Sequence, residues 1–247
     1  MISKLIDLIR YNKDWPKYLY YKYFPPGNGD VVEFRLRTGD NVQIDADGRF
    51  VLNEIFLNHV YDVPGVDLTD AQNILDLGAN VGVFTLYALS RSPNARVFSF
   101  EPSARNFQIL NGNLASKSVR ATAYRMAASN MTGTAVLNVS NTSVEYALNA
   151  GGADGEFVDC IDLKGLFELT GVDVFDMAKI DIEGAERDLL DGAPDDLLRR
   201  FRAISIEWHY TMPEAEVLAN RLRGLGFRVS VEKIEGCIYL KGVQVSS

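Results

Sequence analysis

From residue 73 onward, hydrophobic and polar positions alternate between two periods, one typical of strands and one typical of helices. Apolar runs of strand length occur over 73–77, 96–100, 121–127, 134–139, 174–182 and 203–207, and helical patterns occur over 81–91, 103–116, 185–190 and 213–225. Two more runs flank Glu235-Gly236 and predict a hairpin over 228–240. Because alternating strands and helices form parallel sheets covered on both faces, the pattern predicts an α/β fold with a mostly parallel sheet and a C-terminal antiparallel hairpin.

The first 62 residues follow other patterns and predict a small N-terminal cap, with the main domain over 63–247. Alternation over 31–45 indicates a β-hairpin, and 53–61 indicates a helix. Residues 1–24 hold seven aromatic side chains and five basic against two acidic ones. We expect these aromatic side chains to pack against the main domain; a helix that docks on a membrane surface or a partner is the alternative.

Composition narrows the classes of protein to be considered. The 247 residues include 25 Lys and Arg against 33 Asp and Glu, so the net charge is −8 and nucleic acid is not expected as a substrate. Two cysteines are too few for a disulfide scaffold. No apolar run reaches the ~20 residues that span a bilayer, and no secretory signal stands at the start. We therefore expect a cytoplasmic protein without a transmembrane segment.

A glycine-containing loop follows the first strand of the main domain, where open α/β sheets bind ligands. Gly78 permits a sharp turn and a close ligand, and Gly82 permits close helix–strand packing. The spacing is not that of a dinucleotide fingerprint, because Asn80 replaces a glycine. Asp76 would repel a pyrophosphate and suits a cationic ligand such as S-adenosylmethionine. At the end of the next strand, Glu101 can accept hydrogen bonds from both ribose hydroxyls.

Three segments of the sequence resemble the motifs of the FkbM family of class I S-adenosylmethionine-dependent methyltransferases. They are 76–85 (DLGANVGVFT), 100–103 (FEPS) and 179–186 (KIDIEGAE). The resemblance implies a Rossmann-like class I methyltransferase fold, bound S-adenosyl-L-methionine, and O-methylation of a hydroxyl on a sugar, glycan or secondary metabolite. By this resemblance the cofactor is lined by Asp76, Gly78, Ala79, Asn80, Gly82, Glu101, Pro102, Ser103, Ala127 and Ser129. No acid follows the third strand, so Ser129, Asn130 or backbone groups are left to recognise adenine.

The candidate catalytic side chains lie at the ends of two strands that neighbour each other in this fold. Asp181 and Glu183 are two residues apart, as are Glu207 and His209, so each pair faces one side of its strand. His209, neutral and oriented by Glu207, is the candidate general base, with a structural histidine as the alternative. Glu183 can position the acceptor hydroxyl or help the base, and Asp181 can instead contact the amino group of the cofactor. A divalent metal would suit these oxygen ligands, but no spacing demands one and none is predicted.

Several other functions remain open at this point. A catalytically silent nucleoside-binding module would keep the same fold, and an NAD-dependent oxidoreductase is disfavoured by Asp76 and Asn80. The expected partner is a hydroxyl acceptor, either a small molecule or a glycan. The basic, aromatic segment 1–24 is the candidate contact of a homodimer.

Overall fold

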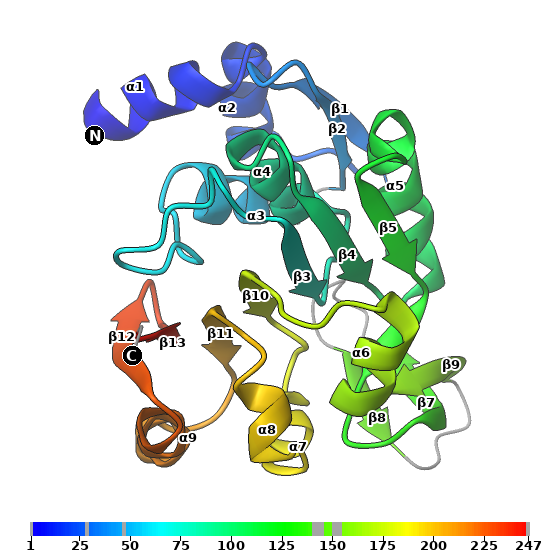
Figure 1. The fold of residues 1–247 in the computed structure, drawn as a ribbon. Helices are drawn as coiled ribbons and strands as arrows, with labels where there is room; N and C mark the ends of the chain where they lie inside the picture. Colours follow the sequence, from blue (N-terminus) through cyan, green and yellow to red (C-terminus); the bar gives the residue numbers. More distant parts are fainter. Residues whose placement is uncertain (1, 28–29, 46–47, 140–145, 150–154, 246–247) are drawn as a thin grey trace.

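A seven-stranded sheet forms the centre of the computed structural model, which describes residues 2–27, 30–45, 48–139, 146–149 and 155–245 (Figure 1). Its strands lie in the order β12-β13-β11-β10-β3-β4-β5. They are β3 (Asn73–Leu77), β4 (Arg96–Phe100), β5 (Ala121–Tyr124), β10 (Met177–Ile180), β11 (Ala203–Trp208), β12 (Phe227–Ile234) and β13 (Cys237–Gln244). Neighbouring strands are parallel except that β13 runs antiparallel to both β11 and β12. The predicted mostly parallel sheet with a C-terminal hairpin is confirmed.

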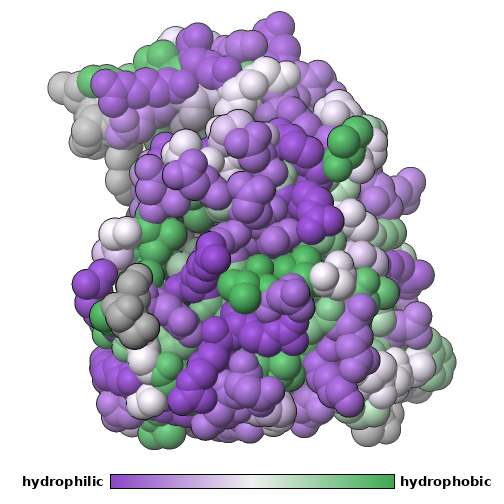
Figure 2. Space-filling view, viewed as in Figure 1, coloured by the Kyte–Doolittle hydropathy of each residue, from purple (hydrophilic) through white to green (hydrophobic). Residues whose placement is uncertain are grey.

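Helices cover the two faces of this sheet in two groups. One group is α3 (Gly48–Phe56), α4 (Val83–Arg91) and α5 (Ala104–Leu114, continued by the 3₁₀ turn Ala115–Lys117). The other is α6 (Leu163–Thr170), α7 (Glu186–Asp191), α8 (Asp195–Leu198) and α9 (Met212–Gly224). Side chains along β3 point alternately to the two faces of the sheet. Ile74 packs in the core beneath α3, α4 and α5, and Leu75 and Leu77 pack in the core beneath α6 to α9. In Figure 2 hydrophobic side chains gather in a band across the middle of a largely hydrophilic face.

The order of the strands reverses beside β3, and this reversal positions the site. The chain runs outward from β3 to β4 and β5, then returns to place β10 on the other side of β3. Ligands of open α/β sheets bind outside the carboxyl ends of the strands at such a point. The loop after β3 and the segment after β10 therefore lie next to each other.

A second sheet, which the sequence did not predict, lies beyond the edge strand β5. The single strand predicted over 121–127 is two strands, because pairing changes partner at Arg125. The order in this sheet is β6-β9-β7-β8, with bounds β6 Met126–Ala128, β7 Gly133–Val139, β8 Tyr146–Asn149 and β9 Glu156–Ile161. The strand expected over 134–139 is confirmed as β7, whereas most of the loop expected over 149–155 lies outside the described residues.

The N-terminal part holds two helices and a hairpin beside α3. These are α1 (Ile2–Tyr11), α2 (Trp15–Tyr23) and the antiparallel pair β1 (Val32–Arg35) and β2 (Asn41–Ile44). The hairpin was predicted, but the helix expected over 53–61 begins earlier and ends at Phe56. Tyr11 and Tyr18 are buried, whereas Tyr20, Tyr23 and Phe24 are exposed. The ring contacts of the two buried tyrosines, Tyr11 with Phe56 and Tyr18 with Phe34, lie within residues 1–62, whereas packing against the main domain was expected. Within the described ranges, no helix combines the length and the hydrophobicity needed to cross a bilayer.

Candidate active site

A cavity of about 290 Å³ lies at the carboxyl ends of β3, β4, β10 and β11. We call its two parts the loop end and the charged end. The loop end consists of Gly78, Ala79, Asn80, Glu101 and Pro102, and the charged end consists of Asp181, Glu183, Glu207 and His209. The N-terminal part contributes Val51, Glu54 and Ile55 from α3, and β13 contributes Cys237. The structure thus brings the four predicted catalytic side chains to one cavity.

Gly78 is required by a contact within the protein. Its φ is +75°, and a Cβ atom added there would lie 1.6 Å from the carbonyl oxygen of Asp181. Any side chain would therefore push the loop away from the segment after β10. Gly82 (φ +89°) is similar, because a Cβ would lie 2.6 Å from Cδ1 of Leu110. The predicted close approach at Gly82 is thus to α5 rather than to a strand.

Glu101 joins the loop after β3 to the end of β4. Its Oε2 accepts a hydrogen bond from the backbone N–H of Asn80 (2.9 Å), and its Oε1 accepts one from that of Ser103 (2.9 Å). Burial raises the pKa of Glu101 to about 7, although these two amides act in the opposite direction. Each carboxylate oxygen keeps a second lone pair, so Glu101 can still accept hydroxyl hydrogens from a ligand in the cavity.

Asp76 lies beneath the loop and is not among the residues that line the cavity. Its carboxylate is fully buried, accepts a hydrogen bond from Thr85 (2.7 Å) and faces the ammonium of Lys179 (Oδ1–Nζ 3.4 Å). Lys179 also donates to the carbonyl oxygen of Gly78 (2.6 Å) and lies 3.3 Å from Oδ2 of Asp181. Burial lowers the pKa of Lys179, but the two carboxylates outweigh it and raise that pKa above its ordinary value. The contact of Asp76 with a cationic ligand, expected from the sequence, is replaced by this internal cation.

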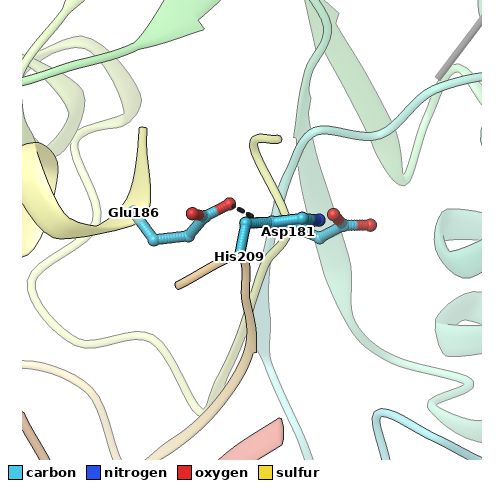
Figure 3. A group of neighbouring side chains, drawn as sticks. All are labelled: Asp181, Glu186 and His209. Carbon is cyan, nitrogen blue, oxygen red and sulfur yellow. Dashed lines mark hydrogen bonds and ion pairs between the residues drawn. The ribbon is translucent and has the colours of Figure 1, made fainter. Parts of the chain in front are cut away.

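His209 is clamped between two glutamates at the charged end. Its Nδ1 lies 2.9 Å from Oε1 of Glu186, and its Nε2 lies 3.2 Å from Oε2 of Glu183. Figure 3 shows the imidazole between the carboxylates of Glu186 and Asp181. Burial alone would lower the pKa of His209, but the hydrogen bonds with Glu183 and Glu186 raise it to about 11. The expected orientation by Glu207 is therefore wrong: Glu186 orients the ring, and carboxylates at both ring nitrogens together with the raised pKa favour the imidazolium over the expected neutral imidazole.

Glu186 is held by the backbone of its own loop. Its Oε1 accepts hydrogen bonds from the N–H groups of Ile182 (3.0 Å) and Gly184 (3.1 Å), and its side chain is fully buried. This tight turn places Glu183 in the left-handed region, at φ +52°. The KIDIEGAE segment thus builds one unit in which a buried carboxylate fixes both the turn and the imidazolium.

Glu207 contacts tyrosines in place of His209. Its Oε2 accepts hydrogen bonds from the hydroxyls of Tyr61 (2.8 Å) and Tyr239 (3.1 Å). The hydroxyl of Tyr61 also lies 2.8 Å from Oδ2 of Asp181. Sequence reasoning missed Tyr61 and Glu54, because both belong to the N-terminal part and no local motif marks either residue.

Comparison with known proteins places this site in a family. The model of the methyltransferase FkbM domain matches residues 76–229. The chain belongs to the FkbM methyltransferase family. The 31-O-demethyl-FK506 methyltransferase FkbM of Streptomyces tacrolimicus is 28% identical to this methyltransferase, over 83% of this chain and 92% of the relative. The antimetabolite synthetase AmbE of Pseudomonas aeruginosa is 30% identical over 74% of this chain, which spans only 11% of AmbE.

The fold agrees with this assignment. The METTL16 methyltransferase domain superposes with a TM-score of 0.53 at 14% identity, over 85% of this methyltransferase and 75% of that domain. The fold is therefore the class I methyltransferase fold, as predicted. The family and the fold together give S-adenosylmethionine as the cofactor.

The residues of the cavity fit this cofactor. Glu101 lines the cavity and has free lone pairs, which suit ribose hydroxyls, and an apolar wall suits a purine ring. That wall consists of Phe100, Pro102, Ala127, Ala128 and Leu137. Of the predicted cofactor positions, Gly78, Ala79, Asn80, Glu101, Pro102 and Ala127 line the cavity, and Asp76, Gly82, Ser103 and Ser129 do not. Ser103 instead caps the N-terminus of α5 and donates its backbone N–H to Glu101, while Ser129 donates its backbone N–H to the carbonyl oxygen of Ile161.

Among the described residues, one group that joins the charged end to the buried Glu186 has ligand atoms close enough together for a metal ion. Atoms of Asp181, Glu186 and His209 lie within 4.8 Å of one another (Figure 3). Glu186 and His209 already bond each other, and Glu186 also accepts backbone amides. Their geometry is thus explained by contacts within the chain, and we assign no metal ligands.

Proposed function

We propose that this methyltransferase methylates a hydroxyl oxygen of a small molecule, namely a secondary metabolite, a sugar or a glycan. The observation that carries the proposal is Glu183, a carboxylate that faces the cavity beside an imidazolium. Methylation of a hydroxyl releases a proton, so a proton acceptor must stand at the reacting oxygen. The name of the relative from Streptomyces tacrolimicus, a 31-O-demethyl-FK506 methyltransferase, supports an oxygen acceptor.

We assign the proton to Glu183 because His209 has no free lone pair. Both ring nitrogens of an imidazolium carry hydrogen, and here they point at Glu186 and Glu183. Burial raises the pKa of Glu183 above its ordinary value, although the hydrogen bond from His209 works against that rise. A carboxylate of raised pKa accepts a proton more readily, and the contact with His209 holds the carboxylate of Glu183 in place.

We assign the cofactor, the acceptor and the proton acceptor to different parts of the cavity. When bound, S-adenosylmethionine supplies a methyl group on a positively charged sulfur. Glu183 would accept the proton that the acceptor hydroxyl loses as its oxygen takes the methyl group, which would leave the sulfur of the cofactor neutral. The loop end holds the cofactor, while Asp181 and Glu207 flank the acceptor. We further propose that residues 1–62 act as a cap, since Val51, Glu54 and Ile55 of α3 form the wall on the acceptor side.

Transfer of a radiolabelled methyl group to a panel of hydroxyl compounds tests this proposal. The panel contains macrolides, monosaccharides and oligosaccharides. Amines and a short RNA, similar in size to the oligosaccharides, are included as acceptors of other classes. We expect label in hydroxyl compounds, and a kcat for Glu183→Gln about 10²- to 10⁴-fold below that of the native enzyme at unchanged cofactor affinity. Glu168→Gln, at an exposed glutamate on α6, is the matched control and should keep full activity.

Three outcomes would contradict the proposal. Label found only in the amines or the RNA would remove the oxygen acceptor. Full activity of Glu183→Gln would remove its role as the proton acceptor. Tight cofactor binding with no transfer to any compound would support a catalytically silent binding module.

A further inference from the structure

Tyr61 places one hydroxyl group between two carboxyl groups. Its oxygen lies 2.8 Å from Oδ2 of Asp181 and 2.8 Å from Oε2 of Glu207. The side chain is buried, with 5% of the residue exposed, and its ring packs edge-on against Phe84 and Tyr239. A phenol has a single hydrogen and can donate it to only one of the two carboxyl oxygens.

The second contact must therefore contain another proton. Two oxygens that both lack hydrogen repel each other at hydrogen-bond distance, and burial strengthens that repulsion. If one carboxyl group is protonated, it donates to the oxygen of Tyr61 while Tyr61 donates to the other carboxylate. Both contacts are then hydrogen bonds of ordinary length.

The surrounding charges decide which carboxyl group holds this proton. The buried ammonium of Lys179 lies 3.3 Å from Oδ2 of Asp181 and stabilises the negative charge there. No ion pair joins a cation to Glu207 among the described residues: its side-chain contacts are the hydroxyls of Tyr61 and Tyr239 and the thiol of Cys237. The other titratable groups whose charges act on Glu207 are Lys179 of β10, Glu54 of α3, Asp181 and Glu183 after β10, and His209 beyond β11. Burial raises the pKa of Glu207, and the charge of Asp181 raises it further. The hydrogen bonds from Tyr61 and Cys237 and the charge of His209 lower the pKa of Glu207.

We infer that Tyr61 is a positioning residue that holds Glu207 as a neutral carboxylic acid and Asp181 as a carboxylate. The hydrogen-bonded chain runs from Glu207 to the oxygen of Tyr61 and from Tyr61 to Asp181. A neutral Glu207 cannot take the proton of an acceptor hydroxyl, so this chain directs that proton to Glu183. This consequence for catalysis rests on the proposed function, whereas the retained proton does not.

Infrared spectroscopy of the intact protein tests the retained proton directly. Above about pH 8, Glu54 and Glu101, whose pKa values lie at about 7, are ionised and contribute little to the carbonyl band of protonated carboxyl groups. We expect the native protein to keep such a band there and Glu207→Gln to lose it. Tyr61→Phe should lose the band about one pH unit below the native protein, because Glu207 has lost its hydrogen-bond acceptor.

Asp181→Asn is the companion variant, and it should also move the loss of the band to lower pH. A native spectrum without a band that Glu207→Gln removes would overturn the inference, as would a band with the same pH midpoint in Tyr61→Phe. Thermal unfolding checks that the variants are folded. Methyl transfer measured in parallel separates the two claims, since the spectra depend only on the proton and the rates also depend on the proposed function.

Discussion

The loop end and the charged end belong to the same cavity, but different kinds of contact hold their residues in place. At the loop end, Glu101 accepts two backbone amides from residues next to it in sequence or one strand away. At the charged end, side chains from the segment after β10, from β11 and the residue that follows it, from β13 and from the N-terminal part meet. Each carboxyl group there has a side-chain partner far along the chain. The backbone therefore fixes the shape of the loop end, whereas the balance of charges and protons fixes the charged end.

The strongest test of this comparison is a substitution at Gly78, where the loop end contacts Asp181 of the charged end. Gly78→Ala should cost more than about 4 kcal/mol of the free energy of unfolding or prevent folding, because the new methyl group would overlap the carbonyl oxygen of Asp181. Gly39→Ala is the matched control, since Gly39 has φ +97° and nothing within 4 Å of the added atom. It should cost about 1 kcal/mol by strain alone. Denaturant unfolding gives both values, and equal costs would mean that the contact does not hold the ends together.

Removal of the buried cation should have the next largest effect. Lys179→Met leaves Asp76 and Asp181 without their shared cation and should destabilise the fold by about 3–5 kcal/mol. Lys164→Met removes an exposed ion pair with Glu168 and should change the stability by less than about 1 kcal/mol. Thermal or denaturant unfolding compares the two. A stability loss as small as that of Lys164→Met would show that Lys179 does not balance the charged end.

The pH dependence of ligand binding gives the smallest of these effects and concerns the loop end alone. With a pKa of about 7 in the free protein, Glu101 is protonated below that pH and ionised above it. Ribose hydroxyls favour the ionised form, so the affinity for S-adenosylhomocysteine should fall by up to about tenfold per pH unit below pH 7. Glu101→Gln should bind about 10- to 100-fold more weakly at alkaline pH and show a flatter profile. Calorimetric titration measures this, and a native affinity independent of pH would contradict it.

Sequence patterns predicted most of the central sheet, and a few residues show why the second sheet and the contacts of the site could not be predicted. The apolar run over 121–127 looks like one strand because hydrophobicity does not report which strand a residue pairs with; that change of partner is visible only in the paired registers. Glu186 is an acid in the first turn of α7, a position that the helix dipole alone would explain, yet it orients His209 from 23 residues away. Tyr61 carries no motif at all.

What the sequence determined by itself is local. The DLGANVG loop, the acid at the end of β4 and the KIDIEGAE turn each depend on neighbouring residues, and those neighbours are enough to indicate a class I methyltransferase. The tertiary structure decided which groups carry charge. Asp76 meets Lys179, His209 meets two glutamates, and Glu207 meets Tyr61 only after the strands are assembled. Protonation depends on burial and on the nearest charges, and both are set by residues that are distant in sequence.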